Sequence, residues 1–164
     1  MIILGISYLS DASACLLING KITAAISEER LNRKKNWFGV PHKSIKKVLS
    51  ISKINIEDVD LIATHGVKNK NKSLKNYNNK KKDIFNSKIS DDEKKEQYES
   101  LYLRRKKELY AYKRVNKNIN EIKSLGKEVL IFGHHESHGA SAFFSTNKKD
   151  GYILTMDGWG EDGF

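Results

Sequence analysis

Residues 1–27, MIILGISYLSDASACLLINGKITAAIS, predict three short β-strands joined by tight turns. Met1 to Ser7 is apolar and rich in β-branched residues, and Ala12 to Ile18 follows a polar turn. Asn19-Gly20 strongly indicates a two-residue hairpin, because both residues tolerate the positive φ angles that this turn needs. Ile22 to Ser27 is the third strand, so we expect the chain to begin with a β-rich unit.

Helices and strands alternate through the rest of the chain. Pro41 opens a helix that continues through Ser50, with Ile45, Val48 and Leu49 on its inner face, and Val59 to Thr64 is a short buried strand. Further along, the patterns predict a strand over 128–132, a helix over 134–145 and a strand over 152–156. The expected order is β-β-β-α-β-α-β-α and then a new strand, which is typical of an α/β fold with a mixed sheet.

The excess of positive over negative charge is confined to the middle of the chain. Residues 66–130 hold 19 of the 30 Lys and Arg but 9 of the 20 Asp and Glu, so the flanking parts are neutral and the whole excess of +10 lies here. Lys68 to Lys88 is rich in Asn and Lys and predicts a loop or a partly disordered stretch. Asp91 to Leu125 predicts a helix with an apolar stripe. Its charges fit a solvated helical face, with a phosphate-binding patch as the alternative.

The composition also restricts the compartment. No apolar run approaches the roughly 20 residues that cross a bilayer. The first residues have no basic region before their apolar run, so they do not resemble a signal peptide. A single cysteine, Cys15, excludes an internal disulfide and is expected to be a small buried residue rather than a reactive thiol. These features predict a cytoplasmic protein.

Two histidines suggest a metal site near the C-terminal end of the sequence. His134 and His138 are four residues apart, so on a helix they lie on one face and can share one ion. Asp157 follows His138 by nineteen positions and could add a carboxylate from a strand end. Imidazole with carboxylate suits iron, zinc or manganese. A chance pair of polar surface residues is the alternative.

Four sequence blocks resemble the N-terminal portion of the NodU/CmcH-type carbamoyltransferases. They match the opening strand and turn, the EER-x-x-R-x-K segment, the HH-x-x-H-x-x-SA block and the DG-x-G-[DE] turn of that family, and here they are Gly5–Ala14, Gly20–Lys35, His134–Ala142 and Asp157–Glu161. The resemblance implies a Kae1/TsaD-like catalytic domain with an actin-like ATPase (ribonuclease H-like) lobe. It assigns residues 1–150 to this lobe, with a basic insertion over 66–127, and residues 151–164 to the start of a truncated second lobe.

The same resemblance implies a reaction. Carbamoyl phosphate and ATP would give carbamoyl adenylate, and the carbamoyl group would pass to a hydroxyl of a small-molecule or sugar acceptor. By this match the metal ligands are His134, His138 and Asp157, the cofactor-binding residues are Ser13, Gly158, Gly160 and Glu161, and the catalytic residues are Asp11, Arg33 and Lys35. A divalent metal is implied, with iron favoured, and a further aspartate ligand is expected from beyond position 164.

Two positions depart from the family pattern. Ser10 and Asn36 stand where the family usually has histidine, which puts activation of the acceptor in doubt. The sequence therefore predicts an N-terminal fragment that is inactive alone, or one part of a split enzyme completed by a second chain. A non-catalytic module that binds RNA or an acidic partner through the basic helix is the alternative, although nucleic acid is not favoured.

Overall fold

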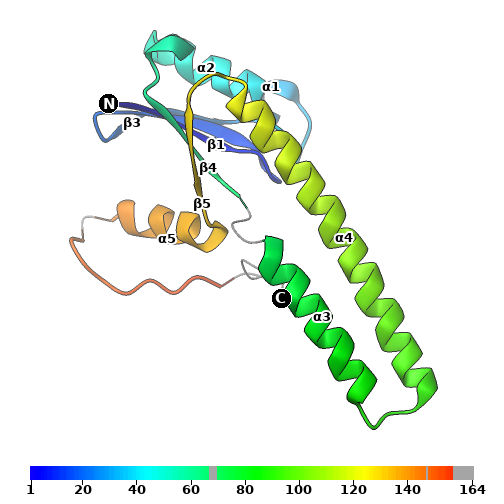
Figure 1. Ribbon diagram of the computed structural model, residues 1–164. Coiled ribbons are helices and arrows are strands. Elements are labelled where there is room, and N and C mark those ends of the chain that lie inside the picture. Colours follow the sequence, from blue (N-terminus) through cyan, green and yellow to red (C-terminus); the bar gives the residue numbers. More distant parts are fainter. Residues whose placement is uncertain (67–69, 147, 157–164) are drawn as a thin grey trace. The chain divides into compact units, whose positions relative to one another are not determined.

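The computed structural model describes residues 1–66, 70–146 and 148–156 (Figure 1). The chain divides into two compact units. The first comprises Met1–Gly66 and Asn116–Gly133, and the second comprises Val67–Val115 and His134–Phe164. Whether residues 1–150 form one lobe stays a prediction.

A five-stranded mixed sheet forms the centre of the first unit, with the strand order β3-β2-β1-β4-β5. β1, β2 and β3 form an antiparallel meander, whereas β4 pairs parallel to β1 and β5 pairs parallel to β4. The strands are β1 (Ile2–Ser7), β2 (Ser13–Ile18), β3 (Lys21–Ser27), β4 (Leu61–His65) and β5 (Glu128–Phe132). The predicted mixed α/β fold is therefore confirmed, and all five of these strands were expected from the sequence.

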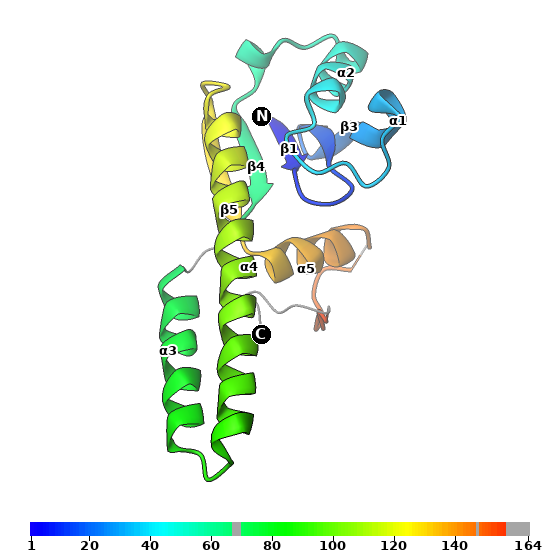
Figure 2. The ribbon, with the colours of Figure 1, turned by 90° about the vertical axis from the view of Figure 1, so that its right-hand side faces the viewer.

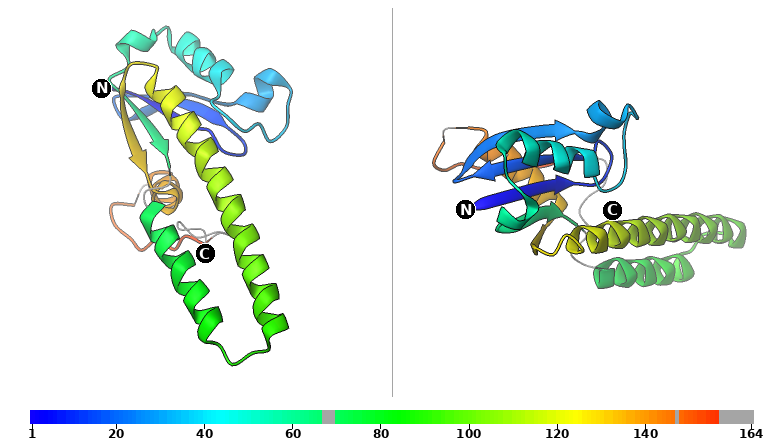
Figure 3. Two further views of the ribbon diagram at one scale, coloured as in Figure 1. Left: turned by 45° about the vertical axis from the view of Figure 1, so that its right-hand side comes forward. Right: turned by 90° about the horizontal axis from the view of Figure 1, so that it is seen from above.

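The turns and the helix beside the sheet also follow the sequence pattern. Asn19 and Gly20 have φ angles of 49° and 79°, as the predicted hairpin turn requires. Two helices, α1 (Glu28–Asn32) and α2 (His42–Ser52), and a 3-10 turn, η1 (Ile56–Asp58), separate β3 from β4. α2 packs on β2 and β3 (Figure 3) and buries the predicted inner face of Ile45, Val48 and Leu49.

Large apolar side chains and one tyrosine form the core of this unit. Leu4, Leu16 and Ile62 on the strands are fully buried, and so are Tyr8 and Ile122. Ile122 belongs to the last turns of α4 (Asp91–Lys123), which return the chain to the sheet before β5. The predicted apolar stripe of this helix is thus a core element at its C-terminal end.

A pair of helices replaces the predicted loop in the second unit. α3 (Lys70–Asn86) runs beside α4 as an antiparallel hairpin (Figure 2), so the prediction of a loop over 68–88 is wrong. The Arg105 guanidinium lies 5.8 Å from the Tyr77 ring, and the Tyr98 hydroxyl donates to the Lys81 carbonyl at 3.3 Å. Such contacts supply stabilisation that a short polar helix lacks by itself.

The end of the described chain contains one helix and one extended segment. α5 (His134–Phe144) lies close to the predicted bounds. Residues 152–156 form no strand, so that prediction is wrong. A strand needs a hydrogen-bonded neighbour, and none of the described residues pairs with this segment. Instead Ile153 and Thr155 approach Gly139 of α5, where an added Cβ would lie 3.7 Å and 3.9 Å from their methyl carbons.

None of the helices in the described part of the chain is both long enough and apolar enough to cross a lipid bilayer.

Candidate functional site

The turn between β1 and β2 carries two of the predicted site residues. Asp11 is exposed at a φ of 62°, a conformation that aspartate tolerates better than most residues. Ser13 is half-buried and begins β2 directly opposite Ser7 of β1. Between them Ala12 is buried, donates its N–H to the Trp37 carbonyl at 3.1 Å and accepts from the Glu28 N–H at 2.8 Å. The backbone thus ties this turn to the segment that follows β3.

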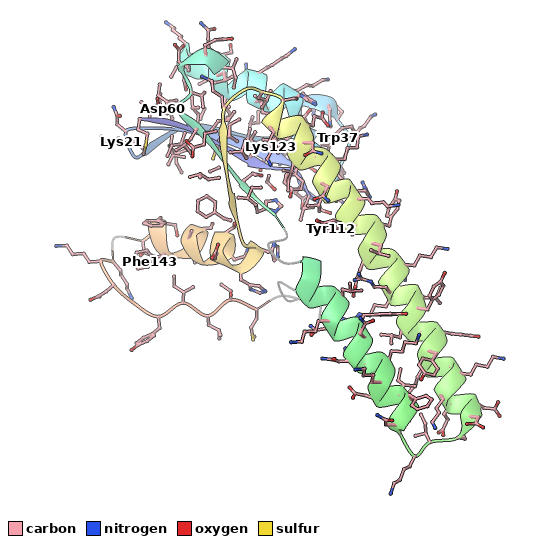
Figure 4. The ribbon with its side chains drawn as sticks, in the orientation of Figure 1. Lys21, Trp37, Asp60, Tyr112, Lys123 and Phe143 are labelled. Atoms are coloured by element: carbon pink, nitrogen blue, oxygen red, sulfur yellow. The ribbon has the colours of Figure 1, made fainter. Side chains whose placement is uncertain are left out.

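The loop after α1 carries the two predicted basic residues. Arg33 and Lys35 are both exposed, and Arg33 caps α1 in the left-handed conformation with a φ of 62°. The Lys34 ammonium lies 5.4 Å from the Trp37 ring, which is labelled in Figure 4. Because Trp37 binds the β1–β2 turn through its carbonyl, the structure brings this loop next to the turn that holds Asp11.

The first glutamate of the EER segment has a structural role that the sequence did not indicate. Glu28 is only 4% exposed. One of its carboxylate oxygens accepts from the Ser44 N–H at 2.7 Å and from the Ser44 hydroxyl at 2.9 Å, and the other accepts from the Lys43 N–H at 3.3 Å. The carboxylate therefore caps the N-terminus of α2, where unpaired N–H groups favour a negative charge.

Polar side chains line one end of the sheet. Ser27, Ser13 and Ser7 stand opposite one another across β3, β2 and β1, so their side chains share one face. On the next strand His65 ends β4, and its Nε2 lies 3.3 Å from the Ser7 Oγ. His65 was not among the predicted site residues. Its place directly after the buried β4 strand was the available signal, since the carboxyl ends of parallel strands meet at one edge.

The predicted metal-binding histidines do come together on α5. The Nε2 atoms of His134 and His138 are 3.1 Å apart, and their rings meet edge to face with centroids 4.5 Å apart. His134 is half-buried and His138 is exposed. The Nδ1 of His135, which follows His134 in the sequence, lies 2.8 Å from the hydroxyl oxygen of Thr155.

The third predicted metal ligand and three of the predicted cofactor-binding residues belong to the last eight positions of the sequence. Asp157, Gly158, Gly160 and Glu161 lie outside the described residues. Within the described part of the chain, no group of three or more His, Cys, Asp or Glu side chains gathers around a point that could hold a metal ion. The structure therefore provides a histidine pair, and the third ligand stays a prediction.

Comparison with known proteins identifies the family. A family model described as the carbamoyltransferase N-terminus matches residues 2–162. Nodulation protein NolNO of Sinorhizobium fredii is 26% identical over 160 residues, which cover 94% of this chain and 20% of that protein. An uncharacterized protein of Synechocystis sp. is 33% identical over 163 residues, which cover 97% of this chain and 26% of that protein.

A third relative extends the range of organisms. An uncharacterized protein of Methanocaldococcus jannaschii is 27% identical over 159 residues, which cover 97% of this chain and 22% of that protein. The chain thus spans about a quarter or less of the length of these curated relatives. Because the family model matches nearly all of it, the chain belongs to the carbamoyltransferase N-terminus family, which confirms its resemblance to NodU/CmcH-type carbamoyltransferases.

Proposed function

We propose that this chain forms the N-terminal part of an ATP-dependent O-carbamoyltransferase. Carbamoyl phosphate and ATP are its proposed substrates, and the carbamoyl group passes from carbamoyl adenylate to the hydroxyl of a small-molecule or sugar acceptor. The family match supports the transferase class. The five-stranded mixed sheet is compatible with the first lobe of an actin-like fold. A second lobe, on this chain or on another, would complete the nucleotide site.

The histidine pair is the observation that carries this proposal. An ion bound at about 2.1 Å by each of two imidazole nitrogens, with octahedral to tetrahedral angles between the bonds, holds those nitrogens about 3.0–3.4 Å apart. The Nε2 atoms of His134 and His138 are 3.1 Å apart, a hydrogen-bond distance that also falls within this range. They fit a divalent cation such as iron, zinc or manganese, with Asp157 as the proposed third ligand. Once bound, that cation would act as a Lewis acid toward the phosphate of the donor.

The β1–β2 turn and the loop after α1 carry side chains suited to an anionic donor. Arg33 adopts a left-handed conformation at a helix end where glycine would cost less. Strained backbone of this kind is found more often at functional sites than elsewhere. We assign Arg33 and Lys35 to binding of the anionic donor, because guanidinium and ammonium groups pair with phosphate. Asp11 and Ser13 would contact the donor or the acceptor from the adjoining turn.

Metal titration of the chain tests the histidine pair. Calorimetry with Mn²⁺, Zn²⁺ and, without oxygen, Fe²⁺ should show binding that weakens by about 100-fold or more in His134→Ala and in His138→Ala, since each removes one direct ligand. His42→Ala is the matched control, because His42 lies on α2 and contacts Glu121 at 2.6 Å. Equal metal affinity in the wild type and in both α5 variants would refute the proposal.

A second candidate function rests on the outer surface of the helical hairpin. One face of α4 carries a stripe of six exposed residues, here called the basic stripe: Leu103, Lys106, Lys107, Tyr110, Lys113 and Arg114. It has four cations and no acid, and the Arg114 guanidinium lies 5.8 Å from the Tyr110 ring. Basic side chains interleaved with aromatic rings suit single-stranded RNA, whose phosphates and bases they contact. RNA binding is therefore the alternative function.

A charge-matched comparison separates the two functions. Binding of a fluorescent 20-nucleotide oligouridine should weaken steeply with added salt if the basic stripe binds phosphates. Lys106→Gln/Lys107→Gln should then lower the affinity about 10-fold. Lys46→Gln/Lys47→Gln, which removes two exposed cations from α2, should lower it far less. Equal losses from both double variants would mean that only net charge attracts the RNA, and the alternative would fail.

A further inference from the structure

Ser7 and His65 form a hydroxyl–imidazole pair at the carboxyl ends of neighbouring strands. β1 and β4 run parallel, with Ile6 opposite Thr64 as their last paired residues, so Ser7 and His65 come next on each strand. The Ser7 Oγ lies 3.3 Å from the His65 Nε2. Both residues are half-buried, which leaves the pair accessible to a small molecule.

The imidazole is held in place from the interior. The Tyr8 ring stacks on His65 with centroids 4.7 Å apart and an angle of 16° between the planes. Tyr8 is fully buried, and its hydroxyl has no hydrogen-bond partner among the described residues. A stacked, buried ring fixes the plane of the imidazole and so directs its Nε2 toward the strand edge, because rotation would break the stacking.

We propose that Ser7 and His65 accept the proton of the acceptor hydroxyl, an inference that rests on the proposed carbamoyl transfer. The acceptor oxygen attacks the carbamoyl carbon of the mixed carbamoyl–phosphoric anhydride, and its O–H bond breaks. Its proton passes to the Ser7 Oγ, while the Ser7 proton passes to the His65 Nε2. The bond between the carbamoyl carbon and the phosphate oxygen breaks, and the nucleoside monophosphate leaves with the electron pair. Proton transfer of this kind is general-base catalysis through a relay.

An activated carbamate tests the pair without ATP, metal or any other chain. p-Nitrophenyl N-methylcarbamate carbamoylates a serine faster when an imidazole takes the serine proton. Mass spectrometry of the labelled chain should find the N-methylcarbamoyl group on Ser7, and Ser7→Ala should abolish it. His65→Gln should slow labelling by about 100-fold or more, the size expected for loss of a general base. Ser10, exposed in the following turn, is the internal reference and should react slowly in every variant.

Nuclear magnetic resonance of the unmodified chain gives a readout that needs no substitution. The relay requires a neutral imidazole whose Nε2 carries a lone pair, and long-range ¹H–¹⁵N correlations distinguish this tautomer from the other. A protonated Nε2 in the neutral ring, donating to Ser7, would overturn the proposal. So would a labelling rate of Ser7 that His65→Gln leaves unchanged. Because Ser7 labelling uses neither metal nor ATP, it can fail while metal uptake by the α5 histidines persists, and the reverse can also occur.

Discussion

Leu4, Leu16 and Ile62 in the sheet of the first unit are fully buried, whereas Tyr102, Leu103 and Tyr110 on α4 are each more than half exposed. Every strand of the sheet has a partner, and its loops are joined by specific hydrogen bonds such as that from Ala12 to Trp37. In the hairpin of α3 and α4, the Arg105 guanidinium lies near the Tyr77 ring and the Tyr98 hydroxyl donates to the Lys81 carbonyl, while much of the outer surface is solvated. We therefore expect the stability of the sheet unit to depend on individual side chains, and that of the hairpin surface to depend little on any one of them.

The largest expected effect is at Glu28. Glu28→Ala removes the acceptor of three donors on Ser44 and Lys43 and leaves them unsatisfied at the start of α2. Loss of a buried, charge-assisted cap should lower the free energy of unfolding by about 3 kcal/mol. Urea denaturation measures this change. Glu96→Ala, at an exposed position of α4, is the control and should cost less than about 0.5 kcal/mol.

Close packing between β1 and β2 gives the next effect. Gly5 stands opposite Cys15, and a Cβ added at Gly5 would lie 2.6 Å from the Cys15 sulfur. Gly5→Ala should therefore cost about 2 kcal/mol through overpacking. Cys15→Ala removes the sulfur, so the two changes together should cost clearly less than their sum. Additive costs in this double-mutant cycle would show that the sulfur is not the obstacle.

The sheet could be predicted because its pattern is local. Alternating and β-branched residues, with Asn19-Gly20 at the turn, specify three strands without reference to the rest of the chain. The helix α3 was missed because most of its residues are polar and only a few apolar residues mark the helical period. These are Leu74, Tyr77 and Ile84. Packing against α4 stabilises α3, and the local sequence of α3 does not show that α4 will lie beside it.

The candidate site also has features that follow from local sequence and features that depend on distant parts of the chain. The spacing of four positions from His134 to His138 sufficed to predict that the two side chains meet, because residues four apart on a helix share one face. The role of Glu28 depends on α2, which begins fourteen positions further on at His42. Likewise Ser7 and His65 are 58 residues apart and meet only through the parallel pairing of β1 and β4. Pairing between distant strands is a property of the fold, so the sequence placed His65 at a strand end but did not reveal that Ser7 would be its partner.

A pH titration tests the burial of Tyr8, which directly follows β1. Burial raises the pKa of Tyr8 from its ordinary value of 10.0 to about 12. The folded chain then keeps a proton that the unfolded chain loses, so stability falls as the pH rises from 10 to 12. For Tyr8 alone this loss is about 1.4 kcal/mol by pH 11. Denaturation at pH 9 and at pH 11 measures how much unfolding free energy each protein loses between these two pH values. This loss should be smaller in Tyr8→Phe than in the wild type by the contribution of Tyr8.

A smaller effect tests whether the left-handed backbone at Arg33 serves ligand binding or is an ordinary helix end. Arg33 and Lys53 both end a helix in the left-handed conformation, with φ angles of 62° and 54°. Glycine should raise the free energy of unfolding by about 0.5–1 kcal/mol at either position, because it adopts this conformation freely. The functional assignment predicts that only Arg33→Gly weakens binding of carbamoyl phosphate by the chain. Equal binding by both variants would leave Arg33 as an ordinary helix end.

Substitutions on the exposed surface of the hairpin should change the free energy of unfolding least, and the sign of that change is informative. Lys106 and Lys107 have no acidic residue three or four positions away on α4, whereas Lys107 has Arg104 three positions before it. Like charges at this spacing repel by a few tenths of a kcal/mol. Lys106→Gln/Lys107→Gln should therefore leave thermal stability unchanged or slightly raised, by less than about 0.5 kcal/mol. A clear loss of stability would mean that these lysines hold the hairpin together, and the contrast between the tightly fitted sheet and a solvated basic surface would no longer hold.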